Sequence, residues 1–134
     1  MPRNPRRPLL KWLAAPLGFG LLLGTAAFIW GQPKRDVTTR SDAAYAAYQE
    51  AWQHSRQVQY ADALRGYRKA VQLDSTFTMA WARLGLLQMS FGKVEEARAS
   101  YRHAAPRAAH VKPFERAMVE MLDLEINGTE AQRA

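Results

Sequence analysis

The sequence predicts an all-α protein in which a single N-terminal transmembrane helix is followed by a short stack of about five helices. Residues 12–31 contain no charged side chain, which is typical of a membrane-spanning helix. From residue 42 onward the apolar residues recur with helical periods, and no segment alternates with the two-residue period of a strand. In addition, the segment DALRGYRKA at 62–70 returns as EARASYRHA at 96–104. This recurrence after 34 residues indicates a helical repeat.

The excess of positive charge belongs to the N-terminal part of the chain. The whole sequence has a formal net charge of +7, but residues 1–35 contain six Lys and Arg residues and no acidic residue. Residues 36–134 contain 13 basic and 12 acidic residues and are therefore nearly neutral. Because nucleic-acid binding requires basic charge on the folded surface, we expect no nucleic-acid partner. The absence of Cys excludes disulfides, thiolate metal sites and thiol catalysis.

Residues 12–31 are expected to cross the membrane after a basic cytoplasmic tail at residues 1–11. Twenty helical residues extend about 30 Å, the thickness of the hydrocarbon core. Trp12 and Trp30 lie near the ends of the segment, where indole rings anchor a helix at the two membrane interfaces. A cleaved signal peptide and a buried soluble helix remain as alternatives. The long apolar run and the poor cleavage site at residues 25–27 weigh against the first, and the lack of a polar face weighs against the second.

The basic residues around this span predict its orientation. Together with the amino terminus, those that precede it outnumber those that follow, so the N-terminus is expected in the cytoplasm and the C-terminal domain across the membrane. The preceding residues are Arg3, Arg6, Arg7 and Lys11. Gly18, Gly20 and Gly24 give the span a face of small residues. Such a face permits close packing against another helix in lipid.

A linker at residues 32–41 is expected to join the span to a helical domain at residues 42–134. Ser41 and Asp42 form a typical helix start. The expected helices are 42–55, 60–73, 77–91, 94–109 and 113–126. We expect Pro106 to kink or end the fourth helix and Pro113 to occupy the first position of the fifth. Asn127-Gly128 is the expected stop of the last helix, although Asn127-Gly128-Thr129 also matches a glycosylation acceptor.

The 34-residue unit resembles the tetratricopeptide repeat, whose pattern is Trp-x-x-Leu-Gly-x-x-Tyr followed by Ala, Phe or Tyr, Ala and Pro. Six of these eight positions are filled in the second unit, by Trp81, Leu84, Gly85, Ala97, Tyr101 and Ala104. Gln88 replaces the Tyr of the pattern and Ala109 its Pro. The first unit matches in its second helix through Ala63, Tyr67 and Ala70. The resemblance implies two repeats and a partial third or capping helix, with small residues at helix contacts and large ones filling the space between helices.

A looser resemblance suggests a cellular context. The segments SDAAYAAYQEAW, QLDSTFTMAWARLG and KPFERAMVE are similar to the extracytoplasmic tetratricopeptide segments that follow the single span of some bacterial kinase-like signal transducers. The chain contains no Gly-rich loop, catalytic-loop motif or Asp-Phe-Gly of a kinase. What the resemblance implies is therefore a bacterial protein with a periplasmic repeat domain behind a membrane anchor.

No constellation of residues in the sequence indicates catalysis. His54, His103 and His110 are scattered and lack the spacing of metal ligands. The acidic residues at 115–125 fit the solvated face of a helix, and the Ser and Thr residues lack the context of a nucleophile. We therefore expect a non-enzymatic protein without a metal or cofactor.

The remaining candidate for function is a partner-binding groove. In the tetratricopeptide family the first helix of each repeat lines such a groove. The resemblance therefore places the candidate residues on three helices. They are Tyr45, Tyr48 and Trp52; Met79, Ala82, Leu86 and Met89; and Arg116, Glu120 and Asp123. Tyr, Trp and Met are frequent at protein interfaces. The alternative is that Tyr48, Trp52 and Leu86 only fill the core.

These features predict a membrane-anchored protein–protein interaction module. The favoured role is an accessory, assembly or stabilising subunit of a larger bacterial membrane complex of respiratory, photosynthetic, translocation or cytochrome-maturation type. The expected partners are other protein subunits in or near the membrane, together with membrane lipid. The alternative is an extracytoplasmic sensory or scaffold fragment of a kinase-like signalling system.

Overall fold

The computed structural model describes residues 35–133, which fold into five α-helices and one 3-10 helix without a strand. The all-α class predicted from the sequence is therefore confirmed for this part of the chain. The elements are α2 (Asp42–Arg56), α3 (Tyr60–Leu73), α4 (Thr78–Ser90), α5 (Val94–Ala104), η1 (Ala105–His110) and α6 (Pro113–Arg133). The predicted span at residues 12–31, with Trp12, Trp30, Gly18, Gly20 and Gly24, lies outside the described residues. None of the helices within residues 35–133 has the length and apolar character that a membrane crossing requires.

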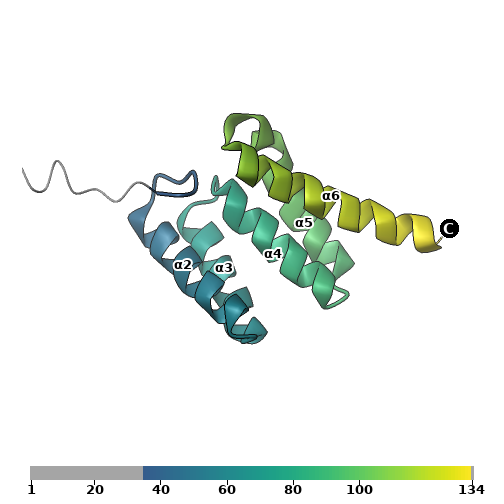
Figure 1. The fold of residues 1–134 in the computed structure, drawn as a ribbon, viewed down its shortest axis with the longest axis horizontal. Helices are drawn as coiled ribbons and strands as arrows, with labels where there is room; N and C mark the ends of the chain where they lie inside the picture. The colour runs from purple at the N-terminus through teal and green to yellow at the C-terminus, as the bar shows by residue number, and fades with distance from the viewer. Residues whose placement is uncertain (1–34, 134) are drawn as a thin grey trace, which may run out of the picture. The chain divides into compact units, whose positions relative to one another are not determined.

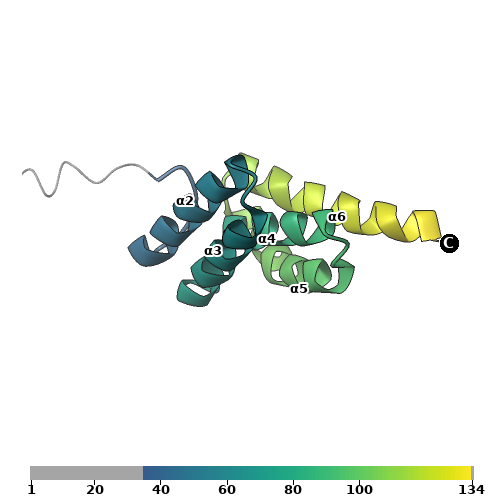
Figure 2. The same cartoon turned by 90° about the horizontal axis from the view of Figure 1, so that it is seen from below.

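The helices form two layers (Figures 1 and 2). Helices α2 and α3 form one antiparallel hairpin, and α4 and α5 form a second hairpin beside it. Helices α2, α4 and α6 follow one another along the front of Figure 1, while α3 and α5 lie behind them. Helix α6 packs on both α4 and α5. This arrangement places one face of α2, α4 and α6 on a common side of the domain.

Both hairpins turn through the same backbone motif. At the end of α2 the amide of Gln59 donates to the carbonyl of His54 over 2.9 Å, and at the end of α4 the amide of Lys93 donates to Gln88 over 2.9 Å. This bond characterises a Schellman turn, which needs one left-handed residue. Val58 (φ 62°) and Gly92 (φ 70°) occupy that position. They lie 34 residues apart, so the two turns follow the same spacing as the sequence repeat.

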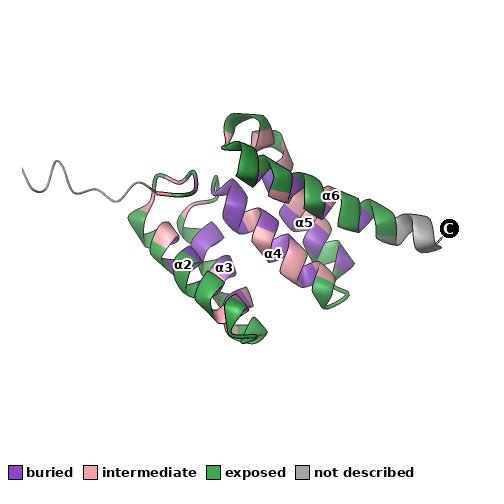
Figure 3. Cartoon of the chain, in the orientation of Figure 1, coloured by how far each residue is buried: buried purple, intermediate pink, exposed green. Residues whose placement is uncertain are grey.

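Buried residues occur on helices of both layers (Figure 3), so the core lies where the layers meet. Its largest fully buried side chains include Tyr67, Phe77 and Met79. The small residues of the repeat pattern are buried, as expected for contact points between helices: Ala63, Ala70, Gly85, Ala97 and Ala104. Leu84 is also buried, while Trp81 and Tyr101 are partly buried and pack against the core.

Gly85 lies where α4 meets α6. A Cβ atom at this position would lie 2.5 Å from Cδ2 of Leu122. The absence of a side chain therefore allows α6 to approach α4, which is the contact that completes the front layer.

A polar network that runs from the interior to the surface joins the two hairpins. Gln88 is buried and accepts a hydrogen bond from Oγ of Ser100 over 2.7 Å. Its side-chain amide donates to Glu96 over 3.3 Å, and Glu96 in turn accepts from Arg68 of α3 over 3.0 Å. Because a buried amide must be hydrogen-bonded to avoid a large cost, these partners make the burial of the Gln88 side chain possible.

Residues 36–41, here named the strap, lie on the domain although the sequence analysis places them in the linker at 32–41. Val37 is buried in the core formed by α2, α3 and α4. The amide of Thr38 donates to Oε1 of Glu115 at the start of α6. The hydroxyl of Thr39 donates to Asp74 over 2.6 Å. The strap is therefore part of the folded domain and joins α2 to α6.

Glu115 contradicts the expectation that residues 115–125 form a solvated acidic face, because it is fully buried. Its second carboxylate oxygen accepts the amide of Lys112 over 3.2 Å. Lys112 precedes Pro113, so this bond is the backward half of a capping box at the start of α6. Burial of the carboxylate is possible because two backbone amides satisfy its oxygens.

The helix boundaries follow the predictions with two exceptions. Helix α5 ends at Ala104, earlier than the predicted end at residue 109, and Pro106 lies in the 3-10 helix that continues the chain. The expected stop at Asn127-Gly128 is wrong, because α6 continues through both residues to Arg133. Within the helix the side chain of Asn127 donates to Asp123, one turn earlier, over 3.2 Å. A glycine inside a helix costs only about 1 kcal/mol, which the rest of α6 offsets.

Candidate functional site

The front layer carries a groove between α2, α4 and the first turn of α6. Its first hollow has a volume of about 210 Å³. Side chains from the strap, α2, α4 and α6 line this hollow: Asp36, Val37, Tyr45, Tyr48, Gln49, Trp52, Arg83 and Phe114. The strap thus forms part of the site, since Val37 contributes to the wall while remaining anchored in the core.

A second hollow of about 180 Å³ continues the groove toward the far end of α2. It is lined by Trp52, Ser55, Tyr60, Tyr67, Arg83, Leu86, Leu87 and Ser90. Trp52 and Arg83 line both hollows and therefore form the ridge between them. The groove accordingly consists of two mainly apolar hollows with one positive charge at their shared boundary.

The ridge is built from contacts that orient Arg83. Its Cζ atom lies 3.7 Å from the centroid of the Trp52 ring, the geometry of a cation–π contact. Its Nε donates to the hydroxyl of Tyr48 over 2.9 Å. The Tyr48 ring lies in turn against Tyr67 and Phe77, with centroids 5.9 Å and 5.1 Å away. The guanidinium therefore rests on an aromatic cluster that is continuous with the core.

Burial raises the pKa values of Tyr48 and Tyr67 above the usual tyrosine value, while the charge of Arg83 opposes that rise. Both hydroxyls therefore remain protonated at neutral pH. A protonated Tyr48 hydroxyl accepts from Arg83 through its oxygen and keeps the charge of the ridge at +1. The site thus presents a positive group in a largely apolar environment.

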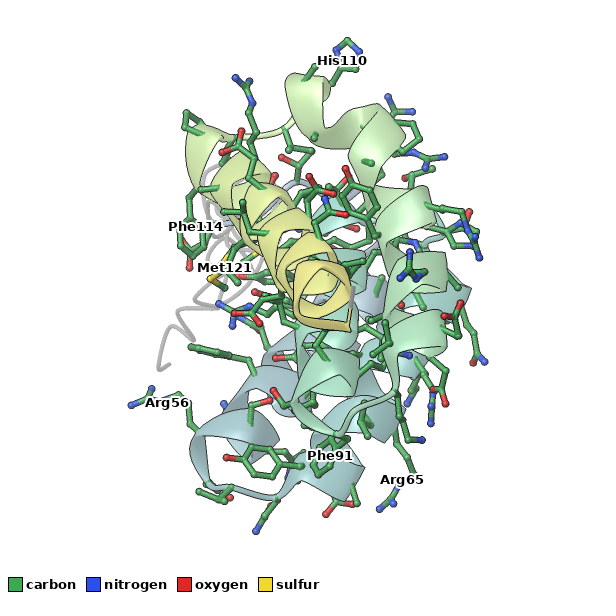
Figure 4. All side chains as sticks on the ribbon, turned by 90° about the vertical axis from the view of Figure 1, so that its right-hand side faces the viewer. Arg56, Arg65, Phe91, His110, Phe114 and Met121 are labelled. Atoms are coloured by element: carbon green, nitrogen blue, oxygen red, sulfur yellow. The ribbon has the colours of Figure 1, made fainter. Side chains whose placement is uncertain are left out.

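Large apolar side chains of the groove and of α6 remain open to solvent. Trp52 is 38% exposed, Phe114 58% and Met121 43%. Phe114 and Met121 point to the same side of α6 in Figure 4, and Arg56 at the end of α2 lies on that side as well. Exposed aromatic residues and Met that gather on one face are typical of protein-binding surfaces.

The structure brings together only part of the predicted groove. Tyr45, Tyr48, Trp52 and Leu86 line the two hollows. Met79 is fully buried and so lies beneath the groove rather than on it. Ala82 is also fully buried.

The predicted groove residues toward α6 have structural contacts instead. Met89 packs against a cluster that contains Leu122 and Ile126. Arg116 is exposed, lines neither hollow and donates to the carbonyls of Ala108 and Ala109 in η1. Burial and the nearby carboxylate of Asp123 raise the pKa of the Tyr101 hydroxyl.

The groove residues that the sequence did not predict include Val37, Arg83 and Phe114. Arg83 had a detectable signal, because it is the one charged residue of α4 and lies three residues before Leu86 on the same helical face. Phe114 follows Pro113 at the start of α6 and resembles a core residue of that helix in sequence. Val37 had no signal, since a single apolar residue in a polar segment has no periodicity.

A more spacious hollow of about 650 Å³ lies at the end of the hairpins, lined by Val58, Tyr60, Leu64, Phe91 and neighbouring residues. The Tyr60 and Phe91 rings meet edge to face with centroids 5.7 Å apart. Figure 4 shows Phe91 at this end of the domain, away from Phe114 and Met121. The charged residues that line it, Asp62 and Lys93, are each engaged in an ion pair with a neighbour on the surface. We therefore place the candidate site in the groove, where the charge is oriented and is not engaged in an ion pair.

Across residues 35–133 no three His, Cys, Asp or Glu side chains gather into a possible metal site. The His103 ring stacks on Trp81 with centroids 4.2 Å apart, and His54 contacts Gln59 over 2.6 Å.

The fold and the groove define an all-helical protein of stacked hairpins with an aromatic-lined surface. In comparisons with known proteins, no family model, curated protein or solved structure matches the chain.

Proposed function

We propose that this chain is a protein–protein interaction module that residues 12–31 anchor in a bacterial membrane, and that its groove binds a segment of another protein. The observation that carries the proposal is that Trp52 and Phe114, both exposed, line one hollow with the oriented charge of Arg83. The exposed Met121 lies on the same side of α6 as Phe114 (Figure 4). Exposed apolar side chains are unfavourable in water unless a partner covers them. A site with this composition has the residues that dominate binding energy at protein interfaces, namely Trp, Tyr and Arg.

A tetratricopeptide-like architecture is part of the proposal. Its support is the 34-residue spacing that appears twice, once in the sequence motif and once in the paired turns at Val58 and Gly92. The buried small residues at the helix contacts support it as well. Stacked repeats of this kind present one helix of each pair along a continuous binding face, which here corresponds to α2, α4 and α6.

The proposed role is an accessory, assembly or stabilising subunit of a membrane complex. Because the strap belongs to the domain from residue 36 onward, only residues 32–35 separate it from the proposed span. Four residues extend at most about 14 Å. A module on so short a connection reaches only those partner surfaces that lie next to the membrane.

Site-specific photo-crosslinking in native membranes tests this proposal. A photoreactive amino acid replaces Trp52 or Phe114 in the full chain, and Lys69 or Arg102, both exposed on the rear layer, serve as matched controls. We expect the two groove positions to form adducts with the same membrane subunit and the control positions to form none. That subunit should also co-purify stoichiometrically in gentle detergent.

Two outcomes would count against this role. Adducts of equal yield from the front and rear layers would remove the groove as the binding site. Purification of the chain without any other subunit, combined with absence of adducts, would remove the interaction module itself. An adduct with a kinase-like receptor would instead support the signalling alternative.

A further inference from the structure

The strongest unassigned feature of the domain is the charge of Arg83. Its side chain is partly buried, stacked on Trp52 and hydrogen-bonded through Nε to Tyr48. These two contacts hold the guanidinium group in place, the Trp52 ring against one face and the Tyr48 hydroxyl at one edge. Since Arg has five N–H donors in a planar fork, donors remain after the Tyr48 bond is made.

Arg83 forms no ion pair with any residue in the part of the chain that the structure describes. In contrast, Arg65, Arg68 and Arg98 each form an ion pair with an acidic residue on an exposed helix face. Asp36 lines the same hollow as Arg83, but its carboxylate is not within ion-pair distance. A partly desolvated positive charge without a counter-ion is costly, so Arg83 favours an anionic group supplied from outside the domain.

The surroundings of Arg83 limit what that group can be attached to. One hollow lies on each side of the ridge, and each is lined mainly by aromatic and aliphatic side chains. Both hollows follow α2, from Tyr45 to Ser55. Ten helical residues correspond to roughly 15 Å. An occupant that fills both hollows therefore needs apolar groups on either side of its charge and a length of about five extended residues.

We propose that the groove binds a peptide segment of the partner in which one Asp or Glu side chain is flanked on both sides by apolar residues. The carboxylate pairs with the free N–H groups of Arg83, and the flanking side chains occupy the two hollows. A single negative charge is matched because Arg83 is the one basic residue that lines either hollow. This inference rests on the proposed function and adds the chemistry of the segment that the groove recognises.

The test uses the full chain in detergent micelles and a library of random 12-residue peptides displayed on phage. Selection on the natural chain should enrich peptides with one acidic residue between apolar residues. Selection on Arg83→Met should lose the acidic residue but keep the apolar ones, because the hollows remain. Selection on Arg102→Met, a change of the same charge on the rear layer, should give the same peptides as the natural chain.

A second measurement does not depend on whether a variant folds. The best selected peptide is synthesised with its acidic residue and with the corresponding amide, and both are titrated against the natural chain by calorimetry. Because a hydrogen bond to a charged group contributes about 1.5–3 kcal/mol, the amide peptide should bind at least about tenfold more weakly. Arg83→Lys should retain part of the preference, since it keeps the charge but loses the planar fork.

The proposal is overturned by any of three results: selected peptides without an acidic residue, equal affinity of the acid and amide peptides, or no selection above background. The crosslinking experiment separates this failure from failure of the proposed function. If Trp52 and Phe114 crosslink to a partner whose bound segment lacks an acidic residue, the interaction module stands and the role of Arg83 is wrong.

Discussion

Replacing Val58 with glycine should stabilise the domain, although it removes an apolar side chain. Val58 adopts φ 62° at the left-handed position of the first hairpin turn. The left-handed conformation costs an ordinary L-residue about 1–2 kcal/mol, and for a β-branched residue it is a genuine outlier. The side chain is 65% exposed, so its removal loses little of the hydrophobic contribution to stability.

The expected size of the effect follows from two opposing terms. Relief of the backbone conformation contributes about 1–2 kcal/mol. The greater freedom of glycine in the unfolded chain costs about 0.5–1 kcal/mol. The central values of the two terms, about 1.5 and about 0.75 kcal/mol, leave a net gain of about 0.75 kcal/mol. For a domain of about 100 residues, a change of 1 kcal/mol shifts the Tm by about 4–8 °C, so the Tm should rise by roughly 3–6 °C.

The second hairpin provides a matched control for this prediction. Gly92 holds the equivalent position with φ 70°, and a Cβ atom there would meet no atom within 4 Å. Gly92→Val should therefore lower the Tm through backbone conformation alone. Both variants are measured in the full chain by circular dichroism at 222 nm during heating in a mild detergent. A lower Tm for Val58→Gly, or an unchanged Tm for Gly92→Val, would refute the argument from backbone strain.

Four further substitutions test the strap, the helix contacts and the interior of α6. Glu115→Gln should lower the free energy of unfolding by about 1–3 kcal/mol, because one of the two amides on the carboxylate loses its acceptor. Urea unfolding measures this loss. Hydrogen exchange should show reduced protection of the Thr38 amide in the strap. Gly66→Ala should be destabilising, since a Cβ there would lie 2.7 Å from a methyl group of α2. In contrast, a Cβ at Gly128 would meet no atom within 4 Å, so Gly128→Ala should raise the free energy of unfolding by about 0.5–1 kcal/mol. Thr39→Val tests the pH dependence of Asp74. Burial raises the pKa of this carboxyl, but hydrogen bonds from Thr39 and a neighbouring threonine outweigh burial and lower it below the usual value. A lowered folded pKa gives stability that is present above the unfolded value of about 3.9 and is lost as the pH falls through the folded value. The variant should therefore be less stable than the natural chain at pH 7, and the difference measured by urea unfolding should shrink at pH 3.

The helices could be predicted from sequence because their determinants are local. Apolar spacing, the Ser41 cap and Pro113 each act within one or two turns, and the structure places helix boundaries close to the expected positions. The errors arise where distant residues decide. Glu115 appears solvated in sequence because its two backbone donors, one of them 77 residues away, are visible only after folding. Gly128 resembles a helix stop in sequence because glycine commonly ends helices, yet α6 continues through it to Arg133.

The groove was only partly predictable for a related reason. In α2 the polar and apolar faces differ, and Tyr45 and Trp52, the groove positions that the repeat resemblance implies, lie seven residues apart on one side of the helix. Helix α4 has one charged residue and apolar residues on most of its circumference. A helix of that kind does not reveal its outward face by periodicity, which is why Met79 was assigned to the groove although it is buried. The charge of Arg83 was the better indicator of the outward face.

The groove belongs to the assembled stack rather than to either hairpin. Its first hollow takes Val37 from the strap, Trp52 from α2, Arg83 from α4 and Phe114 from α6. The bond between the strap and Glu115 connects the first of these elements to the last. Any change that releases the strap from α6 therefore removes one wall of the hollow as well as a contact of the core. Stability of the domain and shape of the binding surface are coupled at this point, and peptide binding should consequently protect the strap amide of Thr38 from hydrogen exchange.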